Sequence, residues 1–315
     1  MPSEPPPATP DLSALFGVVS VRTGDRSVST TLEVREALQD RRGGLHLGAI
    51  TYTADMATGL AMGTAVLERD LWVVTTDLDV HLIAPVTAGP LRIEVEVLRA
   101  GETTVVSAFS LHDDGLGRSV GGGTATGRPF PFSFDRSLLK VPLGQPVDHG
   151  RTPASAGGHL LSELGFRVGE DATVEVDMAD WLRNPWGILH GGVTACLVDV
   201  AGEVAGSAVL GQPVQPVGEM VRYLAPGRVG PVRAVPRVLA VDGGRALVET
   251  RIVDVGAGAR LLAVGSVGLT ARPQADESCE SGTILRPRRP ATTRGQEILG
   301  ATRVSSVKHA GPAAG

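Results

Sequence analysis

The sequence predicts an α+β fold made of two tandem units, each with one long central helix covered by a curved antiparallel sheet of about five strands. The first observation behind this prediction is an internal repeat. His46 recurs 144 residues later as His190, and Asp55 recurs at the same spacing as Asp199. A glycine and a leucine just before His46 are repeated in the same register. A register kept over several positions indicates the tandem duplication of one structural unit.

The second observation is a pair of segments, 47–66 and 190–210, that are apolar on nearly every side. The first segment contains one acid, Asp55, and the second contains only Asp199 and Glu203. A helix without a polar face is expected to be buried. A sheet that must cover such a helix curls around it, which predicts the α+β arrangement.

The remaining segments of both units have the length and composition of β-strands. The run Leu91–Val97 alternates apolar and charged side chains, as expected for an antiparallel strand with one buried face. Clusters of glycine, proline and aspartate separate the runs and predict turns. The expected strands are 16–21, 28–34, 73–83, 90–99, 103–112 and 118–127 in the first unit, and 170–178, 214–224, 231–241, 245–254 and 260–271 in the second.

The two units are expected to occupy residues 12–128 and 158–273, each a normal size for a domain. The proline-rich start, 1–11, and the polar end, 274–315, are predicted to be disordered. The segment 129–157 is predicted to be a linker. Because it holds three of the six phenylalanines, we expect it to pack against the units rather than extend freely.

The composition is that of an ordinary globular chain, with 42% hydrophobic and 20% charged residues. A formal net charge of −5 argues against nucleic acid as a partner, which would require a clustered basic surface. Two cysteines provide no disulfide framework, and neither a secretion signal nor a membrane span is expected, so the sequence predicts a cytoplasmic protein. The glycine run 121–123 does not open a helix after a parallel strand, so no dinucleotide site is expected.

The residues with the clearest chemical potential surround the start of the second central helix. Asn184 precedes His190, Gly191 and Gly192, and Asp199 follows inside the helix. The first turn of a helix carries unpaired N–H groups and the positive end of the helix dipole. Glycine at this point lets a ligand oxygen approach those N–H groups closely. An ionised carboxylate inside a buried helix is costly unless it has a partner or a task.

This motif, Asn-x5-His-Gly-Gly-x6-Asp across the start of a helix, resembles that of the hotdog-fold thioesterases, and most closely the acyl-CoA thioesterases of the phenylacetyl-CoA type. The resemblance implies a double hotdog, in which one chain supplies the two folds that smaller members form by dimerising. It also implies acyl-CoA as the substrate, no metal or other cofactor, and a homodimer of double hotdogs. The first unit departs from the motif, because Asp40 replaces Asn184 and Leu47 replaces Gly191.

A second departure concerns the strand that follows the helix. Some members of this family place a Ser or Thr at its start to assist a water molecule. Residues 212–217 contain neither, so no residue is assigned to this role.

Helix geometry predicts how the motif residues assemble. His190 and Asp199 are nine residues apart, or about 13 Å along the helix axis, so one thioester carbonyl cannot contact both. If the two central helices pack antiparallel, the aspartate of each approaches the start of the other. The first expected site then combines Asn184, His190 and the Gly191 N–H with Asp55, and a second, weaker site combines Asp40, His46 and the Leu47 N–H with Asp199.

Each residue of the first site has an expected role. The Gly191 N–H would stabilise the oxyanion, and Asp55 would activate a water or attack the carbonyl itself. Asn184 would position the water or the carbonyl, and His190 would fix the turn. In the second site, Asp40 beside Asp199 would place two carboxylates in one enclosed space, so one of them is expected to stay protonated.

Less specific interpretations remain open. The histidines can be structural residues that cap a turn, and the aspartates can be hydrogen-bonded to the backbone of the other unit. The alternative functions are a non-catalytic acyl-CoA-binding protein or, with less support, a hotdog hydratase or dehydratase, whose Asp–His pairing is not found in the sequence. Candidates to hold the phosphates of coenzyme A, none of them singled out, are Arg222, Arg228, Arg233 and Arg245.

Overall fold

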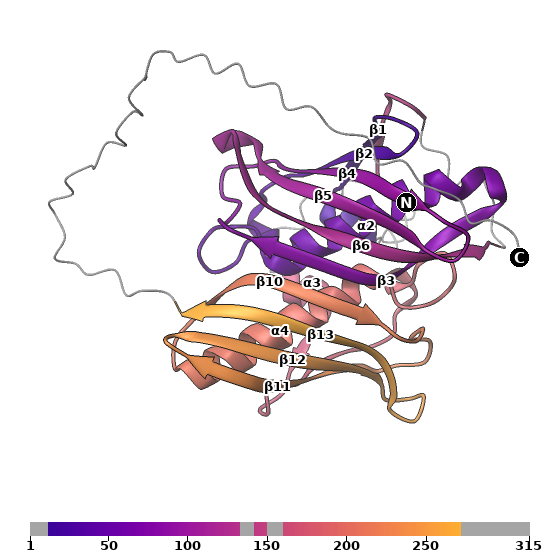
Figure 1. Cartoon of the computed structure of the whole chain (residues 1–315). Helices are drawn as coiled ribbons and strands as arrows, with labels where there is room; N and C mark the ends of the chain where they lie inside the picture. Colours follow the sequence, from indigo (N-terminus) through magenta and orange to yellow (C-terminus); the bar gives the residue numbers. More distant parts are fainter. Residues whose placement is uncertain (1–11, 133–141, 150–159, 272–315) are drawn as a thin grey trace, which may run out of the picture. The chain divides into compact units, whose positions relative to one another are not determined.

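The computed structural model describes residues 12–132, 142–149 and 160–271. Within these residues, 13 strands form one sheet in the order β7-β1-β2-β4-β5-β6-β3-β10-β13-β12-β11-β9-β8 (Figure 1). All neighbouring strands pair antiparallel. The segments predicted to be disordered, 1–11 and 274–315, lie outside the described residues.

Each repeat contributes one long helix and a curved antiparallel sheet, so the predicted double hotdog is confirmed. The first repeat contains α1 (Leu12–Phe16), β1 (Val19–Arg22), β2 (Ser27–Leu32), α2 (Leu47–Val66), β3 (Leu71–Leu82), β4 (Leu91–Ala100), β5 (Val105–Asp113) and β6 (Arg118–Pro131). The second contains α3 (Leu160–Glu163), β8 (Arg167–Val168), β9 (Val174–Val176), α4 (Gly191–Leu210), β10 (Val214–Tyr223), β11 (Val232–Asp242), β12 (Arg245–Asp254) and β13 (Arg260–Ala271). Between them, β7 (Pro146–Asp148) pairs with β1.

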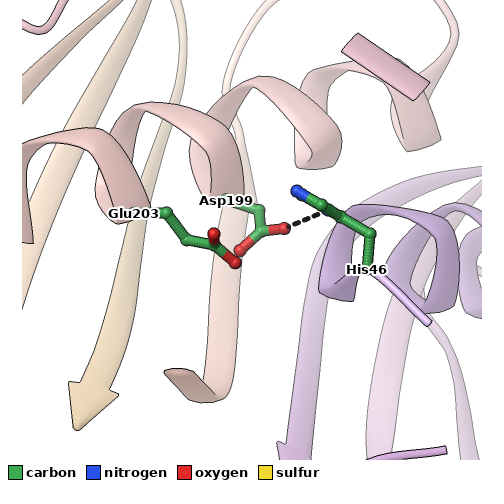
Figure 2. Close-up of side chains that lie close together, drawn as sticks. All are labelled: His46, Asp199 and Glu203. Atoms are coloured by element: carbon green, nitrogen blue, oxygen red, sulfur yellow. Dashed lines mark ion pairs between the residues drawn. The ribbon is translucent and has the colours of Figure 1, made fainter. Parts of the chain in front are cut away.

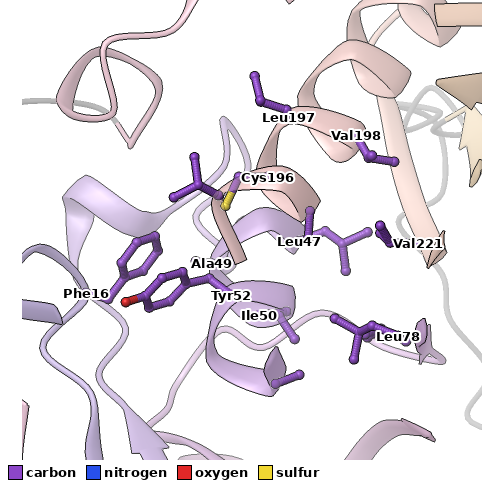
Figure 3. Close-up of a cluster of buried hydrophobic side chains, with 14 of the residues drawn as sticks. Phe16, Leu47, Ala49, Ile50, Tyr52, Leu78, Cys196, Leu197, Val198 and Val221 are labelled. Carbon is purple, nitrogen blue, oxygen red and sulfur yellow. The ribbon is translucent and has the colours of Figure 1, made fainter. Parts of the chain in front are cut away.

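The two central helices, α2 and α4, lie side by side and antiparallel. Gly48 contacts Cys196 and, further along α2, Tyr52 contacts Gly192, so residue numbers rise along one helix as they fall along the other. The close approach depends on glycine, because a Cβ on Gly192 would lie 2.5 Å from the Tyr52 ring. Tyr52 in turn stacks on Phe16, with ring centroids 3.7 Å apart (Figure 3). The antiparallel packing expected from the repeat is therefore confirmed.

Strands β3 and β10 join the two half-sheets into one. They pair antiparallel, with Leu78 opposite Val221. Both side chains are buried, together with Leu47 and Ile50 of α2 (Figure 3). Because the pairing continues from one repeat into the other, both repeats share one hydrophobic core.

Some predicted element boundaries are wrong. The strand expected at 16–21 starts later, because Phe16 ends α1 and Gly17 adopts a left-handed conformation with φ of 65°. The strand expected at 170–178 shrinks to β9, because Ala172, with φ of 63°, lies in the turn between β8 and β9. Within the expected linker, β6 continues to Pro131 and β7 adds a strand, so its described part lies partly in the sheet.

Helix α4 is long and apolar enough to span a membrane by composition, with a mean hydropathy of 1.6. In the structure it packs against β10, β11, β12 and β13, and 67% of the apolar window is buried. The covering of this helix by its own sheet accounts for its apolar composition.

Candidate active site

Asp55, in the third turn of α2, lies at the N-terminus of α4. Its Oδ2 atom is 3.7 Å from Nδ1 of His190, and its side chain is only 8% exposed. A Cβ placed on Gly191 would lie 2.7 Å from the same carboxylate oxygen. An aspartate of the first repeat therefore meets the helix start of the second, in the arrangement expected for antiparallel helices.

Thr75, on β3, holds the other oxygen of this carboxylate. Its hydroxyl donates to Oδ1 of Asp55 at 2.8 Å. The sequence analysis missed Thr75 because it examined the strand that follows α4, whereas the relevant strand follows the helix that carries Asp55. After the central helix the repeat spacing falls from 144 to 141 residues, because one loop is three residues shorter in the second repeat. Thr75 then stands where the second repeat has Pro216, and this difference was visible in the sequence.

The environment of Asp55 alters its affinity for a proton. Burial raises the pKa of Asp55 above its ordinary value, while His190, the Thr75 hydroxyl and the Gly192 N–H act in the opposite direction. A carboxylate whose pKa is raised is a stronger base than aspartate in water. The Thr75 hydroxyl and the Gly192 N–H orient the Asp55 carboxylate.

His190 caps α4 in its neutral form. Burial lowers the pKa of His190, and the nearby Asp55 offsets this only in part. Its Nδ1 atom accepts the Gly192 N–H at 3.0 Å. We therefore assign the remaining proton to Nε2, since an acceptor nitrogen carries none.

Asn184 shapes the loop that leads into α4. Its Oδ1 atom accepts the N–H groups of Trp186 and Ile188 at 3.0 and 3.4 Å. This oxygen is therefore engaged with the backbone. The expected role of Asn184 in positioning a water or the carbonyl rests on its amide nitrogen alone.

Tyr223, at the end of β10, is a second residue that the sequence analysis missed. Its hydroxyl donates to the Gly191 carbonyl at 3.0 Å and so holds the peptide between Gly191 and Gly192. Burial raises the pKa of Tyr223 well above its ordinary value, so the phenol remains protonated. At the 141-residue spacing of this strand, the first repeat has Leu82 at the matching position, and this difference could have drawn attention to Tyr223.

A cavity of about 540 Å³ opens at this point. All four residues expected in the first site line it, namely Asp55, Asn184, His190 and Gly191. The rest of the lining is mainly apolar and comes from both repeats, with Met56, Leu60, Trp72, Trp186, Leu224 and Leu262 among its residues. A cleft of this size, apolar with a few convergent polar groups, is typical of a site for a small molecule.

The second predicted site is a closed ion pair. Nδ1 of His46 lies 2.9 Å from Oδ2 of Asp199, and both side chains are almost fully buried (Figure 2). The Gly48 N–H donates to the same oxygen at 2.7 Å. Leu47, which replaces Gly191, lies in the buried apolar cluster (Figure 3). This helix start is therefore filled by protein atoms.

The charge state of His46 is opposite to that of His190. Burial disfavours the charged imidazolium, but Asp199 outweighs this and raises the pKa of His46 to about 9. Nδ1 of His46 also lies 3.1 Å from the Gly48 nitrogen. Because the Gly48 N–H is closer to Asp199, at 2.7 Å, we assign a proton to Nδ1 and let Asp199 accept from both groups.

Asp40, predicted to share an enclosed space with Asp199, is held by partners in its own loop. Oδ1 of Asp40 accepts the N–H groups of Arg42 and Gly44, at 2.8 and 3.3 Å, and Oδ2 pairs with the Arg42 guanidinium. The carboxyl beside Asp199 is that of Glu203, one turn further along α4 (Figure 2). Burial and the neighbouring Asp199 raise the pKa of Glu203 to about 7.

Among the described residues, His46, Asp199 and Glu203 form a group that could hold a metal ion, since one ligand atom of each lies within 4.8 Å of the others. Two features oppose a cation at this point. Asp199 already accepts the Gly48 N–H and pairs with His46. The positive end of the α2 dipole also points at the same place. A buried ion pair accounts for this group without a metal.

Comparison with known proteins agrees with the fold and with the repeat. The family model of the thioesterase superfamily matches residues 42–119 and 187–258, one segment in each repeat. The TesB protein of Mycobacterium avium subspecies paratuberculosis superposes with a TM-score of 0.53 at 13% identity, over 81% of this chain and 96% of that one. The 12:0-ACP thioesterase of Umbellularia californica gives 0.54 at 10% identity, over 78% and 94%. An acyl-ACP thioesterase of Bacteroides thetaiotaomicron gives 0.51 at 14% identity, over 78% and 98%.

The fold and the family match define the class of protein: two thioesterase-superfamily domains joined as a double hotdog. Both repeats match the thioesterase superfamily, as expected of a thioester hydrolase. At such identities the structural likeness shows the fold alone. The finer resemblance to the phenylacetyl-CoA-type group stays a prediction.

Proposed function

We propose that the protein hydrolyses acyl-CoA thioesters at the site formed by Asp55 of the first repeat and the start of α4 in the second. The observation that carries this proposal is the buried Asp55 carboxylate, which faces a helix N-terminus on the wall of a cavity. The match of both repeats to the thioesterase superfamily supports the type of reaction. The second helix start is closed by Leu47 and an ion pair, which favours a single working site.

The Gly191 N–H binds the oxygen of the thioester carbonyl. Gly191 is the first residue of α4, so its N–H has no acceptor inside the helix. The positive end of the helix dipole favours the negative charge that develops on the oxygen, and a donor of this kind is worth about 3–4 kcal/mol in the transition state. The absence of a side chain keeps the space between Gly191 and Asp55 open to the substrate.

Asp55 acts through Oδ2, because Thr75 donates to Oδ1. As a general base, Asp55 takes a proton from water while the water oxygen attacks the carbonyl carbon. The C–S bond then breaks, and the leaving thiolate receives the proton. As a nucleophile, Oδ2 attacks the carbonyl carbon itself, the thiolate leaves, and water hydrolyses the resulting anhydride. The raised pKa of Asp55 suits the first role.

Substitution of the two aspartates tests the assignment of the site. Asp55→Asn is expected to lower hydrolysis by a factor on the order of 10² or more, as for the loss of a catalytic base. Asp199→Asn should keep most of the activity per folded molecule, because Asp199 serves the closed pair with His46. The rate is followed with a thiol reagent, and circular dichroism gives the folded fraction. If Asp199→Asn lost the hydrolytic activity and Asp55→Asn kept it, the catalytic site would have to be assigned to Asp199 instead.

Single-turnover hydrolysis in water labelled with a heavy oxygen isotope separates the two roles of Asp55. An anhydride intermediate can transfer the label to the Asp55 carboxylate, whereas general-base catalysis places it only in the product acid. Mass spectrometry of the peptide that contains Asp55 provides the measurement.

Two arginines at the cavity favour coenzyme A as the carrier of the acyl group. Arg228, one of the four arginines proposed from the sequence, lines the cavity with Arg128 of the other repeat, and both are exposed. The other three do not belong to the lining residues. Guanidinium groups suit the phosphates of coenzyme A.

The carrier is tested by comparing an acyl-CoA with the matching acyl-ACP, because two of the similar structures are named as acyl-ACP thioesterases. We expect kcat/KM to be larger for the acyl-CoA than for the acyl-ACP. The value for the acyl-CoA should fall in Arg128→Ala and in Arg228→Ala. A larger value with acyl-ACP would contradict coenzyme A as the carrier.

A further inference from the structure

The two repeats allow equivalent positions around the aspartates to be compared. Gly59 lies one turn after Asp55 in α2, and Glu203 lies one turn after Asp199 in α4. A Cβ on Gly59 would have no atom within 4 Å, and Gly59 lines the cavity. At the equivalent position, the Glu203 side chain extends beside Asp199 (Figure 2). The open site thus has glycine where the closed site has a long side chain.

Beyond Gly59 along α2, Trp72 is a further residue that lines the cavity. A Cβ on Gly63 would lie 2.6 Å from three ring atoms of Trp72, so the indole lies with its face against α2. Asp55, Gly59 and Gly63 follow one another at four-residue spacing, so all three lie on one side of the helix. From Asp55 to Gly63 the helix advances by about 12 Å.

The cavity wall along this part of α2 is apolar. Met56, Leu60 and Val73 line it together with Trp72. The Asp55 carboxylate, which also lines the cavity, lies at the start of α4. Such a wall favours binding of an acyl chain, because burial of the chain removes apolar surface from water. It does not favour binding of the charged carrier.

We propose that Gly59 determines the length of the acyl chain that the site accepts, and that the substrate is a medium-length acyl thioester whose chain lies along α2 between Asp55 and Trp72. The inference rests on the proposed function, because that function places the thioester carbonyl at Asp55. Gly59 keeps the path from the carbonyl to Trp72 open, and any larger side chain at this position shortens it.

The test measures kcat/KM for butanoyl-, octanoyl- and hexadecanoyl-CoA in the full-length protein and in three variants. The wild type is expected to prefer octanoyl-CoA. Gly59→Leu should lower kcat/KM for octanoyl-CoA by about tenfold or more while that for butanoyl-CoA changes by less than about threefold. Trp72→Ala should raise the kcat/KM for hexadecanoyl-CoA relative to that for octanoyl-CoA. Glu203→Gln, at the equivalent position of the closed site, is the matched control and should keep the wild-type order.

Leucine is a good helix former, so α2 should be preserved in Gly59→Leu. Thermal unfolding checks this, and Gly59→Ala should give a smaller shift in the same direction if the leucine variant does not fold. A wild type that hydrolyses no acyl thioester overturns the proposed function. An active wild type whose chain-length order is unchanged in Gly59→Leu and Gly59→Ala overturns this inference alone.

Discussion

Gly191 illustrates how one missing side chain opens a helix start. A Cβ at this position would lie 2.7 Å from Oδ2 of Asp55, a distance that would force the carboxylate to move. The equivalent residue, Leu47, is buried at 1% exposure. The N–H at position 191 can therefore meet a ligand, whereas the space around position 47 is occupied by its own side chain.

Replacement of Gly191 by valine should lower kcat/KM by about 10² or more, because the side chain blocks access to a donor that contributes about 3–4 kcal/mol. The melting temperature should change only modestly, since the position is partly exposed at the first turn of α4. Leu47→Gly is the matched control and should leave the rate unchanged. Wild-type activity in Gly191→Val would remove the support for an oxyanion site at this helix start.

Thr75 offers a test of the environment of Asp55. Its hydroxyl donates to Oδ1 and lowers the pKa of Asp55, so Thr75→Val should raise this pKa. The acidic limb of the kcat/KM profile should then move to higher pH. Thr76→Val is the matched control, because the neighbouring hydroxyl donates to the Thr126 carbonyl instead. An acidic limb at the same pH in both variants would contradict a link between Thr75 and the catalytic carboxylate.

At the scale of the helix, α2 and α4 begin after equivalent histidines that are in opposite charge states. Each starts after a histidine whose Nδ1 lies within hydrogen-bond distance of an N–H two residues later. Asp199 holds His46 as a cation at 2.9 Å, while Asp55 lies 3.7 Å from a neutral His190. The tight pair stabilises the interface between the helices, and the looser pair leaves a carboxylate for chemistry.

The buried pair at the start of α2 should make the fold less stable at alkaline pH. The pKa of His46 is raised from 6.5 to about 9. Its stabilising contribution is therefore complete below pH 6.5 and is lost as the pH rises through 9. A shift of this size corresponds to about 3 kcal/mol at most. Denaturant unfolding at both pH values should show this loss.

His46→Gln serves as the reference for this measurement, because glutamine does not titrate. Its free energy of unfolding should differ little between the two pH values. An equal loss in the wild type and in His46→Gln would show that another group is responsible. The pKa of Glu203 is raised from 4.5 to about 7. Its contribution to the free energy of unfolding is therefore complete below pH 4.5 and is lost as the pH rises through 7, below the range in which His46 titrates.

At the scale of the whole molecule, the pairing of β3 with β10 makes the site a property of the complete chain. Asp55 and Thr75 come from the first repeat, whereas His190, Gly191 and Tyr223 come from the second. The two repeats of one chain differ in sequence, so one helix start has glycine at position 191 and the other has leucine at position 47. In a symmetric dimer of identical single domains, both helix starts would carry the same residues.

Two such chains are expected to form a homodimer. Half-exposed aliphatic side chains lie on the side of the second half-sheet that faces away from α4, at Val217, Met220, Val235 and Leu247. Burial of such side chains favours association. Light scattering should give twice the chain mass of 32.6 kDa, and Val235→Glu combined with Leu247→Glu should shift the mass to that of one chain. A wild type that remains a single chain at high concentration would contradict this prediction.

The double hotdog followed from the resemblance of the motif to that of a known family. The sequence by itself determined the two tandem helix-and-sheet units and the range of α2. These features depend on local periodicity and on a repeat register, both of which are written in the chain. The aspartate of each helix approaches the start of the other only if the two helices pack antiparallel, and the tertiary structure shows this packing.

The tertiary structure alone decided which side chains surround each aspartate. It placed Thr75 rather than a residue after α4 against Asp55, and it brought Glu203 beside Asp199. It also showed that the path beyond Asp55 is open at Gly59. These contacts join strands, loops and helices that are distant in the sequence, and their packing depends on the directions of individual side chains, which periodicity does not specify.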